Sequence, residues 1–182
     1  MSHFLLRNKS NIKTILQVSE QNFMHPFFVY GTLLPGQPND YLWGDAITKT
    51  ETAVFPNGIL FDMGHYPMMI EQPDSRVQGR LITVKPASYA TIVANLDALE
   101  GYDPAQPQTS PYRRVERAVL LENGRSASAW LYLGHPRYVV GLLPMKSNDW
   151  IAHVAVKQQQ IRKWWATIDT VAGLHAIEDN ER

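Results

Sequence analysis

Short apolar runs separated by glycine, proline and asparagine predict a chain that is rich in strands. Five runs carry the β-branched and aromatic residues that suit a pleated surface, and they cover residues 27–30, 58–62, 77–84, 112–121 and 126–133. Gly79 interrupts the third run, which indicates a bulge or a close approach of another backbone segment. Residues 40–57 show no pattern that can be assigned.

The last two runs predict a β-hairpin. Asn123-Gly124 lies between them, and Asn-Gly between two such runs is the strongest local signal for a two-residue turn. With a two-residue turn, Tyr132 pairs opposite Val115 and shares a face of the hairpin with Arg113.

Two helices are expected beside these strands. Pro86 opens one that runs to Glu100 and stops at Gly101, the order expected of an N-terminal proline and a glycine at the C-cap. Asp149 caps a second helix that continues to Ile168, with Val154, Ile161, Trp165 and Ile168 on one face. Strands outnumber helices and do not alternate strictly with them. The predicted class is therefore α+β, built on a mostly antiparallel or mixed sheet that can close into a barrel.

A length of 182 residues predicts one domain with a core of ordinary size. We expect residues 1–25 to form an N-terminal extension and residues 26–150 to form the domain. Residues 151–182 are expected to be a C-terminal helix and tail packed on the same domain.

Composition narrows the classes of function. Lys plus Arg equals Asp plus Glu at 17 each, which argues against nucleic-acid and membrane-surface partners. Cysteine is absent, which excludes disulfides, thiolate nucleophiles and cysteine-ligated zinc. The six histidines lack metal-site spacing, so no metal is expected. Neither a G-x-G-x-x-G sequence nor a Walker loop is present, and no cofactor is expected. No apolar run is long enough for a signal peptide or a membrane span, and a cytoplasmic location is expected. Oligomeric state is left open.

The loop after the first strand is the first candidate for a binding site. The run 27–30 ends at Gly31, and Gly36 and two prolines follow within a few residues. A buried strand that enters such a loop leaves backbone N–H groups in need of partners. These donors can bind an anion or a developing oxyanion. The alternative is an ordinary strand followed by a tight turn.

Glu100 is the second candidate, because an acid occupies a place in the apolar stripe of its helix. The stripe consists of Tyr89, Ile92, Val93, Leu96 and Leu99, and Asp97 and Asn95 lie at its margins. Burial and the helix C-terminus both raise the pKa of a carboxyl group at this position. A raised pKa suits a general base at neutral pH. The alternative is a frayed helix end that turns Glu100 to solvent.

Several segments together resemble the γ-glutamylcyclotransferase-like family, which includes γ-glutamylamine cyclotransferase and the AIG2-like proteins. They lie in this order at residues 29–33, 66–69, 77–81, 96–102, 112–114 and 129–132, within a span from Phe27 to Trp150. The resemblance implies a small mixed β-sheet barrel with flanking helices. It also implies that Tyr30, Gly31, Thr32 and Leu33 hold a substrate through their backbone and that Glu100 is the catalytic acid/base.

Tyr112 and Tyr132 are second-tier candidates for the lining of the same cavity. Leu34 departs from the family pattern, because many relatives carry Lys or Arg there, which puts a cationic contact to a substrate carboxylate in doubt. Residues 36–39 look more like the γ-glutamylamine branch than the glutathione-degrading branches.

The predicted function is a γ-glutamyl cyclotransferase that acts on a γ-glutamyl amine or γ-glutamyl amino acid. The substrate's α-amine attacks its own γ-carbonyl, closes 5-oxoproline and expels an amine. Glu100 moves the protons, and no cofactor takes part. The alternative is a module that binds a small ligand or a partner in the same cavity without turnover.

Overall fold

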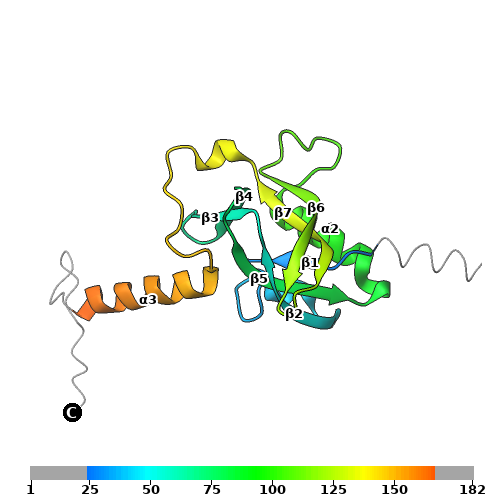
Figure 1. The fold of residues 1–182 in the computed structure, drawn as a ribbon, viewed down its shortest axis with the longest axis horizontal. Coiled ribbons are helices and arrows are strands. Elements are labelled where there is room, and N and C mark those ends of the chain that lie inside the picture. The colour runs from blue at the N-terminus through cyan, green and yellow to red at the C-terminus, as the bar shows by residue number, and fades with distance from the viewer. Residues whose placement is uncertain (1–23, 167–182) are drawn as a thin grey trace, which may run out of the picture.

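The computed structural model describes residues 24–166 of the chain (Figure 1). Its strands are β1 (Phe27–Val29), β2 (Ile47–Phe55), β3 (Gly58–Asp62), β4 (Pro67–Glu71), β5 (Val77–Val84), β6 (Tyr112–Leu121) and β7 (Ser126–Gly134). The α-helices are α2 (Tyr89–Glu100) and α3 (Trp150–Ala166), and short 3₁₀ helices cover η1 (Asp40–Trp43), η2 (Pro86–Ser88) and η3 (Pro136–Val139). Most of the expected N-terminal extension and the end of the second helix near Ile168 fall outside the described residues.

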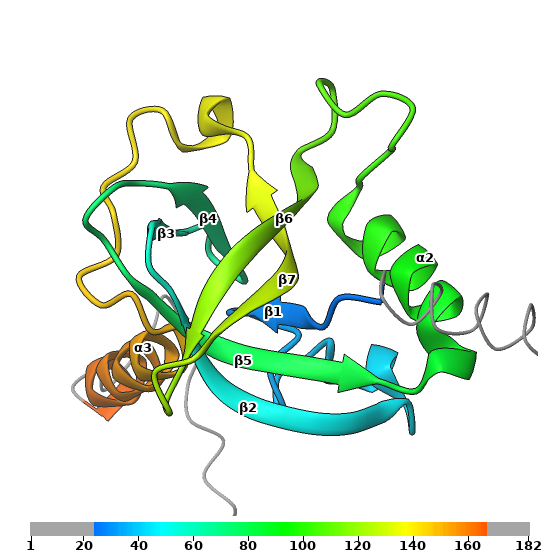
Figure 2. The same cartoon turned by 45° about the vertical axis from the view of Figure 1, so that its right-hand side comes forward.

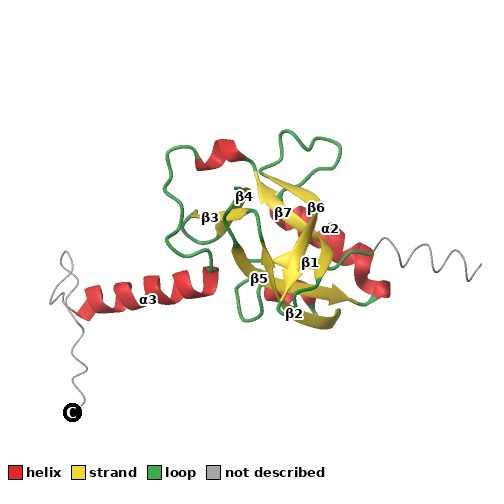
Figure 3. Ribbon diagram, in the orientation of Figure 1, coloured by secondary structure: helices red, strands yellow, loops and turns green. Residues whose placement is uncertain are grey.

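Five strands form a closed barrel in the order β1-β5-β2-β6-β7 (Figure 2). The contact of β1 with β7 is parallel, and the other four contacts are antiparallel. β3 and β4 form a separate antiparallel pair. Figure 3 shows α2 beside this barrel. The prediction of an α+β fold with a small mixed barrel and flanking helices is confirmed.

The alternating side chains of β1 divide the core into two clusters. Phe27 belongs to one cluster, together with Ile92 and Leu96 of α2. Phe28 belongs to the other, together with Phe55 and other residues of the barrel strands. Because successive side chains of a strand point to opposite faces, this short strand links the helix to the barrel.

β5 passes close to β1 at Gly79, as the interruption in its apolar run indicates. A Cβ atom on Gly79 would lie 2.3 Å from the carbonyl oxygen of Val29 and 2.7 Å from the Phe28 ring. No side chain fits there, so glycine allows the two strands to pack. The start of the loop after β1 is thereby held against β5.

The unassigned segment 40–57 contains β2, which was missed for a clear reason. Residues 48–50 of this strand are exposed and polar, whereas only Ala53 and Phe55 are fully buried. A strand without apolar alternation gives no period-2 signal. Its place comes from pairing with β5 on one side and β6 on the other.

The predicted register of the β6–β7 hairpin is wrong by one residue. Tyr132 pairs with Arg114, not with Val115, so it shares a face with Arg114 instead of Arg113. The turn has three residues: the N–H of Leu121 donates to the carbonyl of Arg125, and Gly124 has a positive φ of 78°. The Asn-Gly pair therefore belongs to a three-residue turn with its glycine in the left-handed region, and this loop is one residue longer than the predicted one.

Helix α2 ends as predicted and begins with a tighter turn. The segment from Pro86 is a 3₁₀ turn, and the α-helix starts at Tyr89. Gly101 adopts the left-handed conformation, with φ 62°, and the N–H of Tyr102 donates to the carbonyl of Asp97 at 2.8 Å. This glycine cap ends the helix so that Glu100 is its last residue.

Helix α3 contacts the domain through its first turns. Asp149 caps it through a 3.1 Å hydrogen bond from the N–H of Ala152, as expected, and Trp150 is buried. Val154 packs against the same cluster as Phe28. Beyond these turns the helix extends away from the barrel (Figure 1). Within residues 24–166, no helix is long and apolar enough to cross a membrane.

Candidate active site

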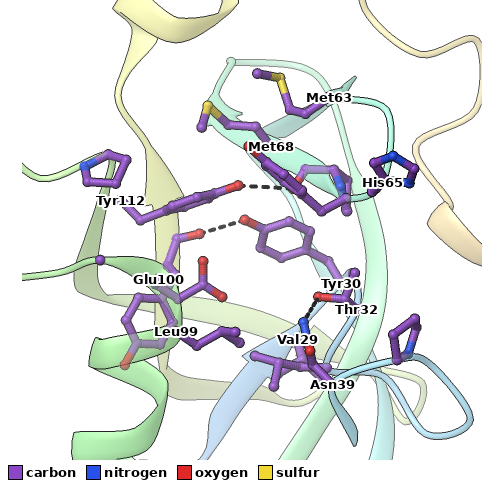
Figure 4. Close-up of a pocket in the computed structure, with 18 of the residues that line it drawn as sticks. Val29, Tyr30, Thr32, Asn39, Met63, His65, Met68, Leu99, Glu100 and Tyr112 are labelled. Carbon is purple, nitrogen blue, oxygen red and sulfur yellow. Dashed lines mark hydrogen bonds between the residues drawn. The ribbon is translucent and has the colours of Figure 1, made fainter.

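A cavity of about 730 Å³ lies between the loop after β1, the end of α2, the β3–β4 turn and the ends of β6 and β7 (Figure 4). The structure brings all seven residues predicted from the sequence to the lining of this cavity: Tyr30, Gly31, Thr32, Leu33, Glu100, Tyr112 and Tyr132. They come from segments up to 102 residues apart. Their individual roles stay predictions.

The loop after β1 is closed by its own hydrogen bonds. The N–H of Leu34 donates to the carbonyl of Gly31 at 3.0 Å, and the backbone and side-chain amides of Asn39 each donate to Thr32 at 2.9 Å. Among the hydrogen bonds of residues 24–166, none has the N–H of Thr32 or Leu33 as its donor. Two adjacent backbone donors of a loop that lines the cavity thus have no partner among the described residues.

Gly31 allows the loop to pass close to β4. A Cβ atom at this position would lie 2.7 Å and 2.9 Å from two ring carbons of Pro67. Both atoms belong to a constrained ring, so a larger residue must displace the loop or the strand. Glycine therefore fixes the distance between the two walls of the cavity.

Glu100 points into the cavity near Tyr30 and Tyr112 (Figure 4). Its carboxyl group has no hydrogen bond and no ion pair with any residue of the described part of the chain. Burial raises its pKa from 4.5 to about 7. A half-buried carboxyl group with such a pKa can accept and return a proton near neutral pH.

Asp97, one turn earlier in α2, has two partners. The Tyr132 hydroxyl donates to its Oδ1 atom at 2.6 Å, and the Arg114 guanidinium lies 3.2 Å from its Oδ2 atom. The sequence placed Asp97 at the margin of the helix stripe as an ordinary polar residue. It lies instead against β6 and β7, in a contact that depends on the observed hairpin register.

Tyr30 and Tyr112 are neutral hydrogen-bond donors at the cavity. Tyr30 donates to the backbone carbonyl of Tyr132 at 2.8 Å, and Tyr112 donates to the carbonyl of Pro67 at 3.2 Å (Figure 4). Burial raises the pKa of both phenols, and the nearby Glu100 carboxylate raises it further. The two hydroxyls hold the loop to β7 and β6 to β4, so they fix the walls around Glu100.

A protein-family model matches the part of the chain that carries this cavity. The model described as "Gamma-glutamyl cyclotransferase, AIG2-like" matches residues 27–152, which include every strand of the barrel and the cavity. The chain belongs to this family. The resemblance noted in the sequence is therefore confirmed. No curated protein matches the chain at a significant level.

Solved structures share the fold of this family member. YkqA from Bacillus subtilis has a TM-score of 0.56 at 19% identity, over 80% of this chain and 51% of that protein. At5g39720.1 from Arabidopsis thaliana has a TM-score of 0.51 at 22% identity, over 79% and 87% of the two chains. An AIG2-like protein from Mus musculus has 23% identity over 69% and 88%, with a TM-score of 0.49. The chain spans about half the length of the Bacillus protein. At these identities the first two show a common fold alone.

Sequence reasoning missed one part of this family member's cavity. Met63, His65 and Tyr66 of the β3–β4 turn line it, as do Met68 of β4 and Tyr138 of η3. From the sequence, His65 in its turn could contact a ligand, but a surface or packing role was favoured. Nothing in the local pattern places a turn and a distant 3₁₀ helix at one opening, because only the folded barrel brings them together.

Proposed function

We propose that this protein is a γ-glutamyl cyclotransferase that releases 5-oxoproline from a γ-glutamyl amine or γ-glutamyl amino acid. The observation that carries the proposal is that one cavity is lined both by Glu100, whose carboxyl group has no partner, and by Thr32 and Leu33, whose N–H groups have none among the described residues. Membership of the γ-glutamyl cyclotransferase, AIG2-like family supports a function of this type.

The first step needs a base. The α-ammonium group of the substrate is not a nucleophile, and Glu100 takes one of its protons. A pKa of about 7 leaves a substantial fraction of Glu100 ionised at neutral pH. The free amine then attacks the γ-carbonyl carbon, and the new C–N bond closes a five-membered ring. Because the reaction is intramolecular, holding the substrate in a curled conformation supplies much of the rate.

The attack turns the γ-carbonyl oxygen into an oxyanion. The N–H groups of Thr32 and Leu33 are suited to donate to it, since they need no reorganisation during the reaction. The hydroxyls of Tyr30 and Tyr112 keep the walls in place and, because burial raises their pKa values, stay neutral. Stabilisation of charge by fixed donors is usually the largest single contribution to catalysis.

Collapse of the intermediate breaks the bond to the leaving nitrogen. Two protons leave the α-nitrogen as it becomes the lactam N–H, and two reach the departing nitrogen, which leaves as an ammonium ion. Glu100 is the proposed carrier in both directions. The acyl group passes from one nitrogen to another within the same molecule, without oxidant, reductant or water.

The test is to incubate the full chain with γ-glutamyl amines, γ-glutamyl amino acids, γ-glutamyl-ε-lysine and glutathione, and to quantify 5-oxoproline. The expected result is 5-oxoproline from at least one compound, in an amount equal to the released amine. Absence of 5-oxoproline from all of them would overturn the proposal. Saturable binding without product would then favour the non-catalytic binding module.

A further inference from the structure

Asn39 makes a hydrogen bond to the side chain of Thr32 at the wall of the cavity. The amide group of Asn39 donates to Thr32 Oγ1 at 2.9 Å, and both residues line the cavity (Figure 4). A hydroxyl group has one proton to donate and lone pairs that accept. Because the amide N–H is directed at a lone pair, the hydroxyl proton points away from Asn39. Among the hydrogen bonds of residues 24–166, none has the Thr32 hydroxyl as its donor.

Asn39 is itself held between the loop and η1. Its backbone N–H donates to the carbonyl of Thr32 at 2.9 Å, and its own carbonyl accepts from the N–H of Leu42 at 3.2 Å. The buried Trp43 of η1 ties the same loop down, because its indole N–H donates to the carbonyl of Leu33 at 2.9 Å. The amide of Asn39 thus reaches Thr32 from a fixed backbone, so the fold itself sets the direction of the hydroxyl proton.

The tyrosine hydroxyls that surround Glu100 have already used their protons. Tyr30 and Tyr112 donate to backbone carbonyls. Tyr132 donates to the carboxylate of Asp97. Each phenol has one proton, so none of these three hydroxyls can donate to a ligand without losing a contact within the protein. The Thr32 hydroxyl differs from them, because it can donate to a ligand at no such cost.

A γ-glutamyl substrate brings a permanent negative charge, the α-carboxylate, into this cavity. Of the described residues, no lysine and no arginine lines the cavity. A carboxylate that loses water without gaining hydrogen bonds is strongly disfavoured, so neutral donors must take it up. A hydroxyl that donates to a carboxylate makes a shorter and stronger bond than one between neutral groups. The Thr32 hydroxyl is suited to this task.

We infer that Asn39 is a positioning residue that turns the hydroxyl proton of Thr32 toward the α-carboxylate of the γ-glutamyl substrate. This role rests on the proposed cyclotransferase function. The α-carboxylate keeps its charge throughout ring closure, so the contact is equally strong in the ground state and in the transition state. It therefore lowers KM, whereas the loop N–H groups, which act on the developing oxyanion, raise kcat.

The test measures KM and kcat of the unmodified protein, Thr32→Val, Asn39→Ala and the double variant on the best substrate of the panel. Thr32→Val should raise KM about 10- to 100-fold, as expected for one hydrogen bond to a charged group, with kcat nearly unchanged. Asn39→Ala should raise KM about three- to tenfold, because the hydroxyl is then free to rotate. In the Thr32→Val background, the same change should raise KM by less than about twofold, because no proton is left to orient.

Three further variants separate orientation of the hydroxyl from general effects on the loop. Thr32→Ser keeps the hydroxyl and should keep KM within about threefold of the unmodified value. In Asn39→Asp the carboxylate can only accept, so the Thr32 hydroxyl turns toward it, and KM should rise more than in Asn39→Ala. Asp40→Ala removes an exposed hydrogen bond to the N–H of Gly36 in the same loop and should change neither constant. For a variant too slow to assay, the dissociation constant of 5-oxoproline, which keeps the carboxylate, replaces KM.

An equal rise of KM on Asn39→Ala with and without the Thr32 hydroxyl would overturn the inference, because Asn39 would then act without this hydroxyl. A lower kcat at unchanged KM in Thr32→Val would also overturn it and would assign the hydroxyl to the oxyanion. So would a KM that depends on His65→Gln and not on Thr32→Val, since His65 would then bind the carboxylate. In all three cases 5-oxoproline is still formed. Failure of the proposed function looks different, because no compound of the panel would give 5-oxoproline.

Discussion

Asp97 and Glu100 lie three residues apart on α2, and of these two carboxyl groups only Asp97 has partners within the described residues. Asp97 accepts from the Tyr132 hydroxyl and faces the Arg114 guanidinium, whereas Glu100 faces the cavity. Burial raises the pKa of Glu100 to about 7. The helix therefore carries one acid that joins it to the barrel and one that is free to move a proton.

Asp97→Asn should destabilise the fold. The substitution leaves the Arg114 guanidinium without a counter-charge in a half-buried site, which costs roughly 1–3 kcal/mol. Chemical denaturation at neutral pH measures the loss. Tyr132→Phe is the matched comparison, because it removes one hydrogen bond and no charge, and it should cost about 1 kcal/mol. An Asp97→Asn variant as stable as the unmodified protein would contradict a structural role for this pair.

Glu100→Gln should make the fold more stable at high pH. The folded pKa of about 7 lies above the unfolded value of 4.5, so the folded state binds more protons between these values. The contribution of Glu100 to stability is therefore full below about pH 4.5 and is lost as the pH rises through 7.

The loss in the free energy of unfolding is at most about 3 kcal/mol. Water in the cavity screens the charge and makes this loss smaller. Chemical denaturation at pH 5 and pH 8 should show that the variant is more stable than the unmodified protein mainly at pH 8. A difference that is the same at both pH values would argue against a raised pKa.

Gly31→Ala should reduce turnover. The added methyl group meets the Pro67 ring, so the loop and its N–H donors move away from β4. Loss of aligned donors of this kind costs about 10²–10³-fold in kcat. Pro35→Ala, at an exposed position of the same loop, is the control and should retain activity. Unchanged kinetics of Gly31→Ala would show that the loop position does not matter for catalysis.

Lys157→Met should loosen the β3–β4 turn. The lysine bonds both Asp62 and Gly64, and the loss of a half-exposed contact of this kind costs about 0.5–1 kcal/mol. Because Met63, His65 and Tyr66 of this turn line the cavity, KM for the best substrate of the panel should rise roughly two- to fivefold.

Lys85→Met, which removes an exposed ion pair with Asp45 away from the cavity, is the matched control. An equal rise of KM in Lys157→Met and in Lys85→Met would mean that the contact of α3 with the turn acts on general stability and not on the cavity.

Asp62 adds a pH dependence to the same contact. Burial alone would raise its pKa, but hydrogen bonds from His153, Lys157 and the N–H of Gly64 lower it to about 2. The stabilisation is therefore present above the ordinary value of 3.8 and is lost as the pH falls through 2. Because the site is partly exposed, the effect is small, and it should disappear from acid-denaturation curves of Asp62→Asn.

Local patterns predicted the elements whose own side chains face the core. The runs at 58–62 and 77–84 match β3 and β5 residue for residue, and Gly101 caps α2 as expected. The position of an acid within the apolar stripe of its helix indicated Glu100 as a candidate without any tertiary contact. In each case the signal is a periodicity or a cap, which a single segment carries by itself.

Features that depend on distant segments were not predictable in this way. β2 shows little apolar alternation, so its own sequence does not predict it. Its place in the barrel comes from its pairing with neighbouring strands. One added residue in the turn sets the register of the hairpin. The contact of Tyr132 with Asp97 depends on that register. The cavity unites a turn, a strand and a 3₁₀ helix from separate parts of the chain. Such juxtapositions are set by tertiary packing.

The most direct test of the central claim is the rate of 5-oxoproline formation by the unmodified protein and by Glu100→Gln, measured from pH 5 to pH 9 on the best substrate of the panel. We predict that kcat/KM of the unmodified protein rises with pH through an apparent pKa near 7, as Glu100 ionises. Glu100→Gln should keep the fold and lose about 10²–10⁴-fold in rate at every pH. Turnover that survives this substitution with the same pH profile would contradict the claim that Glu100 moves the proton.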